Sequence, residues 1–409
     1  MPRAHAPDDT SQTAAAPDAA AMLASASSVE ACVQGLYVHV PFCAHRCHYC
    51  DFFTVAGRDD QRRAFAQRLL GEADVVLPRI PPGIRTVFVG GGTPTHLPPS
   101  VLATLLTGLR ERLAAGGHRI EEWTLEANPD TVSDETAAVL AEAGVTRVSL
   151  GAQSFDPPAL QMLERRHDPA NVGQAMERLR RVGITDLSVD LIFAVPELKD
   201  PVEVWARDLD MALALDPTHL SCYGLTYEAG TPLRRRLDVG RIERVGEEVE
   251  ADLYECARVR LEAAGFEHYE ISNWARPGFR CRHNLVYWTN GNWWPLGPSA
   301  SGHVEGWRWR NLPRLGPYLA GAGLPHIDSV EHLDDDGRAG EMLMLGLRLM
   351  DGVPRDRVTA ACQTPERGAT RTTAIEGALE AGLLQWRGDW LSLSHRGVLV
   401  ADAVIGDLL

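Results

Sequence analysis

The stretch Tyr37-Val-His-Val-Pro-Phe-Cys43-Ala-His-Arg-Cys47-His-Tyr-Cys50-Asp-Phe52 contains three cysteines within eight residues. The apolar run Leu36–Val40 predicts a β-strand that ends shortly before the first cysteine, so the three thiols fall in the loop that follows the strand. Thiolates at this spacing can ligate three irons of one iron–sulfur cubane and leave the fourth iron open for a chelating ligand. Zinc is the alternative, because three nearby histidines raise the number of available ligands.

Short β-rich runs alternate with helix-like patterns as far as about residue 228. The predicted strands are Leu36–Val40, Thr86–Val89, Trp123–Glu126, Arg147–Leu150, Leu187–Ile192 and His219–Cys222. The predicted helices between them are Gln61–Val76, Ser100–Ala115, Ser133–Ala143 and Asn171–Val182. Strand–helix alternation at ~30-residue spacing is typical of βαβ units and a parallel sheet. Six units predict an α/β fold, a partial (β/α)6 TIM-like barrel, with its chemistry at the carboxyl ends of the strands.

The pattern changes on both sides of this barrel. Residues 1–34 are rich in alanine and poor in large apolar side chains, which predicts a disordered tail. Residues 35–228 are assigned to the barrel, 229–334 to an irregular, tryptophan-rich connecting region, and 335–409 to a small C-terminal α+β domain of winged-helix-like type. The last assignment rests on a helical pattern followed by a strand pair, Leu383–Trp386 and Trp390–Leu393, and a final helix.

Charge and composition narrow the classes of partner. The net charge of −15 argues against a nucleic-acid partner. No apolar run reaches the ~18 residues needed to span a membrane, and the N-terminus lacks the basic-then-apolar order of a signal peptide. Clustered cysteines in a chain of this size suggest a metal site in a reducing compartment. These observations predict a cytoplasmic protein.

Polar and glycine-rich segments follow the predicted strands. Gly90-Gly91-Gly92-Thr93 follows the second strand, and glycines let the backbone approach a ligand closely. Glu126 ends the third strand, Gln153 follows the fourth, with Arg165 twelve residues later, and Asp190 lies in the fifth. Each of these residues taken singly has an alternative role, because polar groups at strand ends often cap the next helix.

The cysteine spacing at the end of the first strand is the signature of the radical-SAM superfamily, which this chain resembles. That resemblance implies a [4Fe–4S] cluster on Cys43, Cys47 and Cys50, with S-adenosylmethionine bound to the open iron. The strand-end residues, in this order, resemble the ligand set of oxygen-independent coproporphyrinogen III oxidases. On that resemblance the contacts to S-adenosylmethionine are made by Tyr37, Tyr49, Gly91, Gly92, Thr93, Glu126, Gln153, Arg165 and Asp190.

Two features distinguish the chain from that oxidase branch and make it resemble the HemW-type haem chaperones. The oxidases have a further cysteine two residues after the third, where this chain has Phe52. The segment His283-Asn-Leu-Val-Tyr-Trp288 fits the His-Asn-x-x-Tyr-Trp motif of the chaperones, and Glu341–Arg348 is also similar to them. One departure is Phe193-Ala-Val-Pro196, where that family has Tyr-Gly-Leu-Pro.

A haem site near His283 has some independent chemical support. Six of the ten tryptophans fall between residues 274 and 309, and flat aromatic surface suits a porphyrin. The arginines that can pair with propionates are Arg276, Arg280, Arg282, Arg308 and Arg310. His283 is the candidate axial ligand and Cys281 its competitor. The alternatives are core packing for the tryptophans and a structural, hydrogen-bonded role for His283.

Two functions therefore remain open. The first is a haem chaperone that binds haem and passes it to acceptor haem proteins, with respiratory enzymes and membrane-associated partners the expected class. The second is a radical enzyme such as a coproporphyrinogen III oxidase. Phe52 and the His283 motif favour the chaperone.

Overall fold

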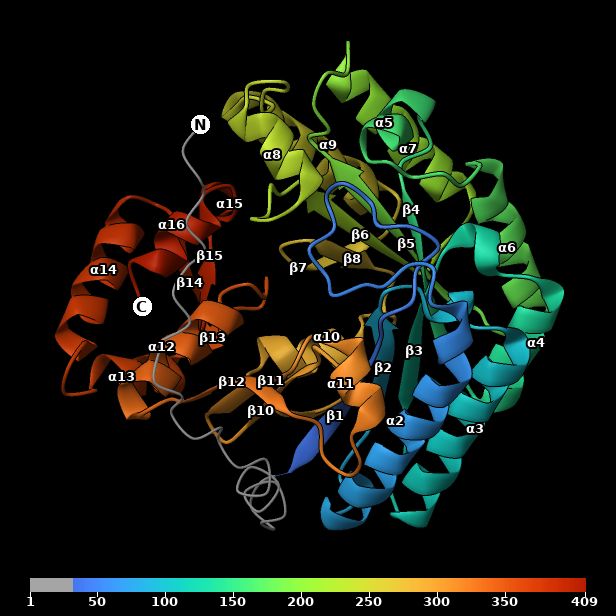
Figure 1. Cartoon of the computed structure of the whole chain (residues 1–409). Helices are drawn as coiled ribbons and strands as arrows, with labels where there is room; N and C mark the ends of the chain where they lie inside the picture. Colours follow the sequence, from blue (N-terminus) through green and yellow to red (C-terminus); the bar gives the residue numbers. More distant parts are fainter. Residues whose placement is uncertain (1–31) are drawn as a thin grey trace, which may run out of the picture.

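A parallel β-sheet with helices on its outer side forms the centre of the molecule (Figure 1). The computed structural model describes residues 32–409. Six parallel strands follow one another in sequence order: β1 (Val33–Val40), β2 (Thr86–Gly91), β3 (Glu122–Ala127), β4 (Arg147–Gln153), β5 (Asp186–Phe193) and β6 (His219–Gly224). The helices between them are α2 (Arg62–Val76), α3 (Pro99–Ala115), α4 (Asp134–Ala143), α5 (Pro157–Met162), α6 (Ala170–Arg181) and α7 (Pro201–Ala214). The predicted six-unit α/β barrel is confirmed.

The tail boundary needs one correction. The sequence assigns Val33 and Gln34 to a disordered tail. In the structure they are the first two residues of strand β1. The Val33 side chain is buried in the core, which stabilises this start of the strand. The rest of that prediction, apart from Cys32, lies outside the described residues.

The strands alternate between an apolar side and a polar side. Leu36, Val87 and Leu125 belong to the buried core shared with the outer helices. Their neighbours along the strands point the other way and include Thr86, Glu122 and Arg147. Successive strand residues face opposite sides of a sheet, so this alternation makes the interior of the barrel polar. TIM barrels usually fill that interior with branched apolar side chains, so the polar interior is unusual.

The sequence suggested that the region after residue 228 is irregular, but the structure contains regular helices and strands there. It contains α8 (Pro232–Asp238), α9 (Glu247–Ala263), α10 (Arg282–Trp288) and α11 (Leu315–Ala320). Its strands are β7 (Glu267–Glu270), β8 (Asn273–Ala275), β9 (Asn292–Leu296), β10 (Ser301–Val304), β11 (Trp307–Asn311) and β12 (Ile327–His332). These short strands extend the sheet at both edges, because β8 pairs with β6 and β9 pairs with β1.

The C-terminal domain is a small α+β unit with its own apolar core. Its elements are α12 (Asp335–Gly346), β13 (Val353–Pro354), α13 (Arg355–Cys362), α14 (Gly368–Glu380), β14 (Leu384–Arg387), β15 (Trp390–Leu393), α15 (His395–Val398) and α16 (Ala401–Gly406). A buried ion pair between Arg371 and Asp336, 3.0 Å apart, joins α14 to α12. Figure 1 shows this unit beside the barrel. Within residues 32–409, no helix has the length and apolarity needed to cross a membrane.

Candidate functional site

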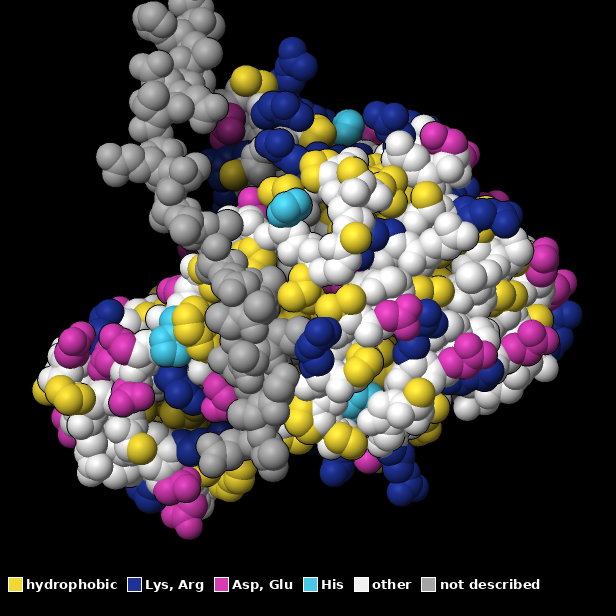
Figure 2. All heavy atoms as spheres, turned by 60° about the horizontal axis from the view of Figure 1, so that its bottom comes forward, with side chains coloured by type: hydrophobic (Ala, Val, Ile, Leu, Met, Phe, Trp, Pro, Cys, Tyr) yellow, Lys and Arg dark blue, Asp and Glu magenta, His cyan; other side chains and the backbone are white. Residues whose placement is uncertain are grey.

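A cavity of about 430 Å³ opens at the carboxyl ends of the barrel strands. It collects most of the residues that the sequence singled out, although they come from six separate segments. The predicted residues that line it are Cys43, Cys47, Cys50, Tyr49, Gly91, Gly92, Thr93, Glu126, Gln153, Arg165 and Asp190. Two predicted residues, Tyr37 and His283, do not line it. The space-filling view in Figure 2 shows another face of the molecule, where charged and apolar side chains are interspersed.

The cysteine loop is fixed by backbone hydrogen bonds. The Cys43 amide donates to the carbonyl of Val55, and the Val55 amide donates to the carbonyl of Pro41. No three His, Cys, Asp and Glu side chains in residues 32–409 converge on one metal-ion position. A cubane would need each of the three thiolates to bind a different iron, which is what the cysteine spacing predicts.

Burial of the cysteine loop keeps two of its thiols protonated in the absence of metal. Burial raises the pKa of the Cys50 thiol to about 11, so the thiol holds its proton until a metal displaces it. Burial also raises the pKa of Cys43, and a hydrogen bond with Thr93 at 3.5 Å opposes this rise. The guanidinium of Arg165 lies 3.9 Å from the Cys47 sulfur.

The glycine-rich turn after β2 is packed against the cysteine loop. The Gly92 amide donates to the carbonyl of Val40, and the Thr93 amide donates to that of Phe42. Gly91 has φ +104°, and a Cβ there would collide with the ring of His39. A side chain at this position would therefore displace the turn. The turn lines the cavity with backbone that a ligand can approach closely.

Two half-buried carboxylates line the cavity and have different hydrogen-bond partners. Glu126 accepts one bond from the Gly91 amide at 3.0 Å. Burial, together with the nearby Asp190, raises the pKa of Glu126 to about 7. Asp190 accepts hydrogen bonds from Ser149, at 2.9 Å to each oxygen, and from Ser188 at 3.2 Å. Two acidic groups at this depth favour a cationic ligand, because a positive charge stabilises their ionised forms.

Gln153 and Arg165 complete the wall of the cavity. Gln153 has φ +65°, a conformation that costs energy in a residue with a side chain and often marks a functional position. Arg165 donates to the carbonyl of Gly151 at 2.5 Å, which fixes its guanidinium between β4 and the cysteine loop. Tyr49 lies in the same wall, and burial raises the pKa of its hydroxyl. The Arg165 guanidinium is therefore held in place before any ligand arrives.

Tyr37 supports the cavity from below. Its hydroxyl is 3.1 Å from His39 Nδ1, and the other ring nitrogen of His39 is 2.9 Å from the carbonyl of Phe53, within the cysteine loop region. Tyr37 is thus linked to the loop through His39, and its contact with S-adenosylmethionine stays a prediction.

His283 lies at the opposite end of the barrel interior. Its side chain is fully buried, with Nδ1 2.8 Å from Thr86 Oγ1 and Nε2 2.7 Å from the Tyr287 hydroxyl. Its backbone amide donates to Glu122 at 2.9 Å. Thr86 and Glu122 begin strands β2 and β3, so His283 sits at the amino ends of the strands. With both ring nitrogens engaged, the observed geometry favours the structural role over iron ligation.

The groups expected to hold a porphyrin beside His283 are likewise engaged. Trp274, Trp294 and Trp309 are buried in the core. Each of the five arginines already pairs with acidic side chains: Arg276 with Asp216, Arg280 with Glu267 and Asp351, Arg282 with Glu121, Arg308 with Glu331 and Glu341, and Arg310 with Asp328. The geometry of this region therefore favours the core-packing alternative for the tryptophans.

Sequence reasoning missed the polar layer beneath the cavity. Ser149, Ser188 and His219 lie inside the barrel and connect to Asp190 by hydrogen bonds. A signal was present, because these polar residues recur at every second position of otherwise apolar strands. Strand-end position alone could not reveal them, since they lie in the middle or at the start of their strands.

Comparisons with known proteins cover almost the whole chain. The model of the radical SAM superfamily matches residues 37–209, and that of the HemN C-terminal domain matches residues 333–400. The heme chaperone HemW of Mycobacterium tuberculosis is 40% identical over 384 residues, which cover 92% of this chain and 94% of the relative. The corresponding heme chaperone HemW of Bacillus subtilis is 32% identical over 384 residues and is covered to 99%.

A solved structure shows the same architecture. Coproporphyrinogen III oxidase (HemN) from Escherichia coli superposes with a TM-score of 0.80 and covers 95% of this chain and 93% of its own. Its sequence identity is 18%, so this likeness establishes the fold alone.

Proposed function

The chain belongs to the HemW family of the radical SAM superfamily, and on that premise we propose that it is a haem chaperone. It binds haem and transfers it to acceptor haem proteins. Phe52 is the residue that favours a haem chaperone over a coproporphyrinogen III oxidase. It lines the cavity beside the cysteines, and 57% of its surface is exposed. The resemblance places a further cysteine at this position in the oxidases. Phenylalanine has no thiol and no exchangeable proton, so any chemistry that depends on that cysteine is absent here.

The proposal includes a [4Fe–4S] cluster and S-adenosylmethionine as resident groups. Cys43, Cys47 and Cys50 would hold three irons, and the glycine turn with Glu126 and Asp190 would hold S-adenosylmethionine at the fourth. The bound pair supplies one-electron chemistry at the sulfonium. The chain's own contribution is orientation: Arg165 and Thr93 contact the thiols, while the half-buried carboxylates of Glu126 and Asp190 attract the positive charge of the ligand.

The haem site is the finer part of the proposal. We retain His283 as the candidate axial ligand, and the structure sets a condition on this role. Both ring nitrogens are hydrogen-bonded, so ligation requires α10 to move away from Thr86 and Glu122. Cys281 is a weaker candidate, because burial and the neighbouring Glu122 raise the pKa of its thiol far above the usual range.

The acceptors and the compartment belong to the same proposal. A chaperone of this kind would act in the cytoplasm, where thiols remain reduced, and would deliver haem to respiratory enzymes, membrane-associated ones among them. The acidic chain, with net charge −15, would favour acceptors with basic docking surfaces.

The test is a haem titration of anaerobically reconstituted protein, run beside an assay for conversion of coproporphyrinogen III to protoporphyrinogen IX. We expect a Soret band and no conversion. Turnover of coproporphyrinogen III, or no haem binding with the cluster in place, would return the chain to the radical-enzyme alternative.

His283→Ala addresses the axial ligand separately. If His283 ligates haem, this variant should lose or shift the Soret band and keep its iron–sulfur signal. An unchanged band would move the ligand elsewhere without affecting the chaperone proposal itself.

A further inference from the structure

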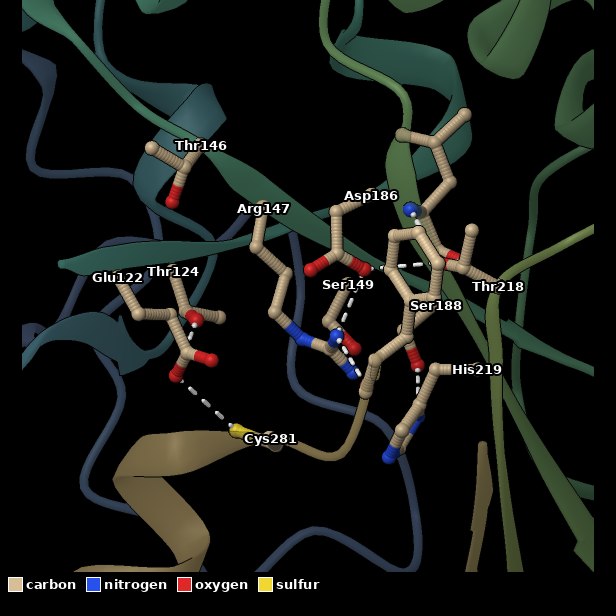
Figure 3. Close-up of polar contacts among 12 residues, drawn as sticks. Glu122, Thr124, Thr146, Arg147, Ser149, Asp186, Ser188, Thr218, His219 and Cys281 are labelled. Carbon is tan, nitrogen blue, oxygen red and sulfur yellow. Dashed lines mark hydrogen bonds and ion pairs between the residues drawn. The ribbon is translucent and has the colours of Figure 1, made fainter. Parts of the chain in front are cut away.

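A chain of hydrogen bonds runs from the cavity into the barrel interior. Asp190 faces the cavity and accepts from Ser188 at 3.2 Å. The Ser188 hydroxyl is 2.8 Å from His219 Nδ1, and His219 Nε2 is 2.9 Å from the Tyr269 hydroxyl. Figure 3 shows Ser188 and His219 pointing toward each other, with Arg147 and Asp186 beside them. Four residues from three strands thus form one continuous chain.

Water does not interrupt this chain, because its inner members are sealed from solvent. Ser188 and Tyr269 are fully buried, and His219 is 2% exposed. Burial and the positive charge of Arg147 hold the pKa of His219 well below its usual value, so its ring is neutral. A neutral imidazole has one N–H and one acceptor nitrogen, and the two must serve different partners.

The hydrogen-bond partners determine which nitrogen carries the proton. An ionised Asp190 can only accept, so the single hydroxyl proton of Ser188 points to Asp190. The Ser188 oxygen then accepts from His219, which places the imidazole proton on Nδ1. The Tyr269 hydroxyl must donate to the remaining nitrogen, Nε2. Every donor in the chain therefore points toward the carboxylate, an arrangement in which successive hydrogen bonds reinforce one another.

We propose that His219 is a positioning residue for the cofactor cavity: as the Nδ1–H tautomer, fixed by Tyr269, it holds Ser188 as a donor to Asp190. The two cavity carboxylates thereby acquire different roles. Asp190 receives donors from Ser149 and Ser188, whereas Glu126 receives one backbone amide. Burial raises the pKa of Asp190, and the hydrogen bonds from the serine hydroxyls oppose that rise, so these donors favour the ionised form that supplies the negative charge.

Tyr269, the last donor in the hydrogen-bond chain, does not belong to the six-stranded barrel. Tyr269 lies in β7, which the region after residue 228 adds to the edge of the sheet through β8. The added strand β7 is thus connected to the cavity residue Asp190 through the hydrogen bonds of this chain. The inference rests on the proposed binding of S-adenosylmethionine and is independent of haem.

The first measurement is the tautomer itself. In protein labelled with ¹⁵N-histidine and free of cluster and ligand, the His219 signals, identified by their loss in a His219 variant, should show a proton on Nδ1. Tyr269→Phe removes the donor to Nε2 and should give a mixture of tautomers. A proton on Nε2 in the unmodified chain would overturn the proposal, whatever the protein binds.

The second measurement compares two substitutions at one position. Asn places its amide N–H near Nδ1 and keeps the donor to Ser188, whereas Gln reaches toward Nε2 and loses it. With reconstituted protein, S-adenosylmethionine affinity should stay within about threefold for His219→Asn and fall about tenfold for His219→Gln. Equal losses in both variants, or none in either, would contradict the positioning role.

Controls separate this outcome from instability and from failure of the proposed cofactor. His268→Asn alters a half-buried histidine that stacks on Trp274, with ring centroids 4.4 Å apart, and that is not a member of the hydrogen-bond chain, so it should leave affinity unchanged. Thermal midpoints of all variants should be compared. If the unmodified protein fails to bind S-adenosylmethionine, the cofactor proposal is wrong, and the tautomer measurement still decides the role of His219.

Discussion

The two ends of the barrel interior are both polar, yet they are built for different purposes. At the carboxyl ends of the strands, Glu126 and Asp190 face a cavity of about 430 Å³. At the amino ends, the segment that includes α10 closes the interior. There Glu122 accepts from the amides of Arg282 and His283, and Arg147 pairs with Asp186 at 2.7 Å.

The difference lies in how each end balances its buried charges. A buried charge is tolerated when it is paired and hydrogen-bonded, which is the state of the α10 end. At the cavity end, the hydrogen-bond donors to the two carboxylates within residues 32–409 are serine hydroxyls and one backbone amide. A polar barrel interior is therefore not by itself a binding site. The end whose charges still lack a counter-charge is the one prepared for a cationic ligand.

The largest effect should come from removing the thiols of the cavity end. Replacing Cys43, Cys47 and Cys50 together by Ala should abolish the cluster, because no ligand for the irons remains. Iron and sulfide analysis with the absorbance of the reconstituted protein measures this loss. Cys222→Ala is the control, since Cys222 is buried in the core away from the loop and the cluster should persist. A cluster retained in the triple variant would refute the assignment.

Breaking an ion pair at the amino ends of the strands should instead lower the free energy of unfolding. Arg147→Ala removes the counter-charge of Asp186, which keeps the hydrogen bond from Thr218, and also removes the bond to the carbonyl of Phe279. We expect unfolding free energy to fall by about 3–5 kcal/mol in denaturant titration. The control is Arg207→Ala, whose exposed pair with Glu203 is worth about 0.5 kcal/mol. If Arg147→Ala lowered the unfolding free energy as little as Arg207→Ala does, the proposed difference between the two ends of the barrel would be contradicted.

A single carboxylate of the cavity end should affect binding more than folding. Glu126→Ala should weaken S-adenosylmethionine binding about ten- to hundredfold, or about 1.5–3 kcal/mol, because the charged acceptor is lost. Calorimetric titration of the reconstituted protein measures the change. Glu177→Ala, an exposed site on α6, serves as the matched control. Unchanged affinity in Glu126→Ala with an intact cluster would count against the site.

The smallest effect is a pH dependence at the same end. The pKa of Glu126 is raised to about 7, so the side chain gains its charge as pH rises through that value. The sulfonium cation binds the ionised form more tightly, and affinity should therefore fall as pH is lowered. The expected loss is about tenfold between pH 8 and pH 6. Glu126→Gln should flatten this profile, and an equally steep profile in that variant would assign the dependence to another group.

Short-range patterns in the sequence, together with the family resemblance, identified most of the residues that line the cavity end. The strand before Cys43 and the glycine turn after β2 are local features, each read within about ten residues. Parallel strands bring their carboxyl ends to one edge, so residues at the strand ends converge once the βα alternation is recognised. For this reason eleven of the predicted residues line one cavity.

The contacts at the amino ends of the strands became known only from the tertiary structure. Glu122 meets His283 across 161 positions of sequence, and Tyr269 meets His219 across 50. No periodicity specifies such pairings, because they depend on where short strands such as β7 and β9 join the sheet. The sequence identified the His283 motif, and long-range packing placed it at the amino ends of the strands with both ring nitrogens engaged.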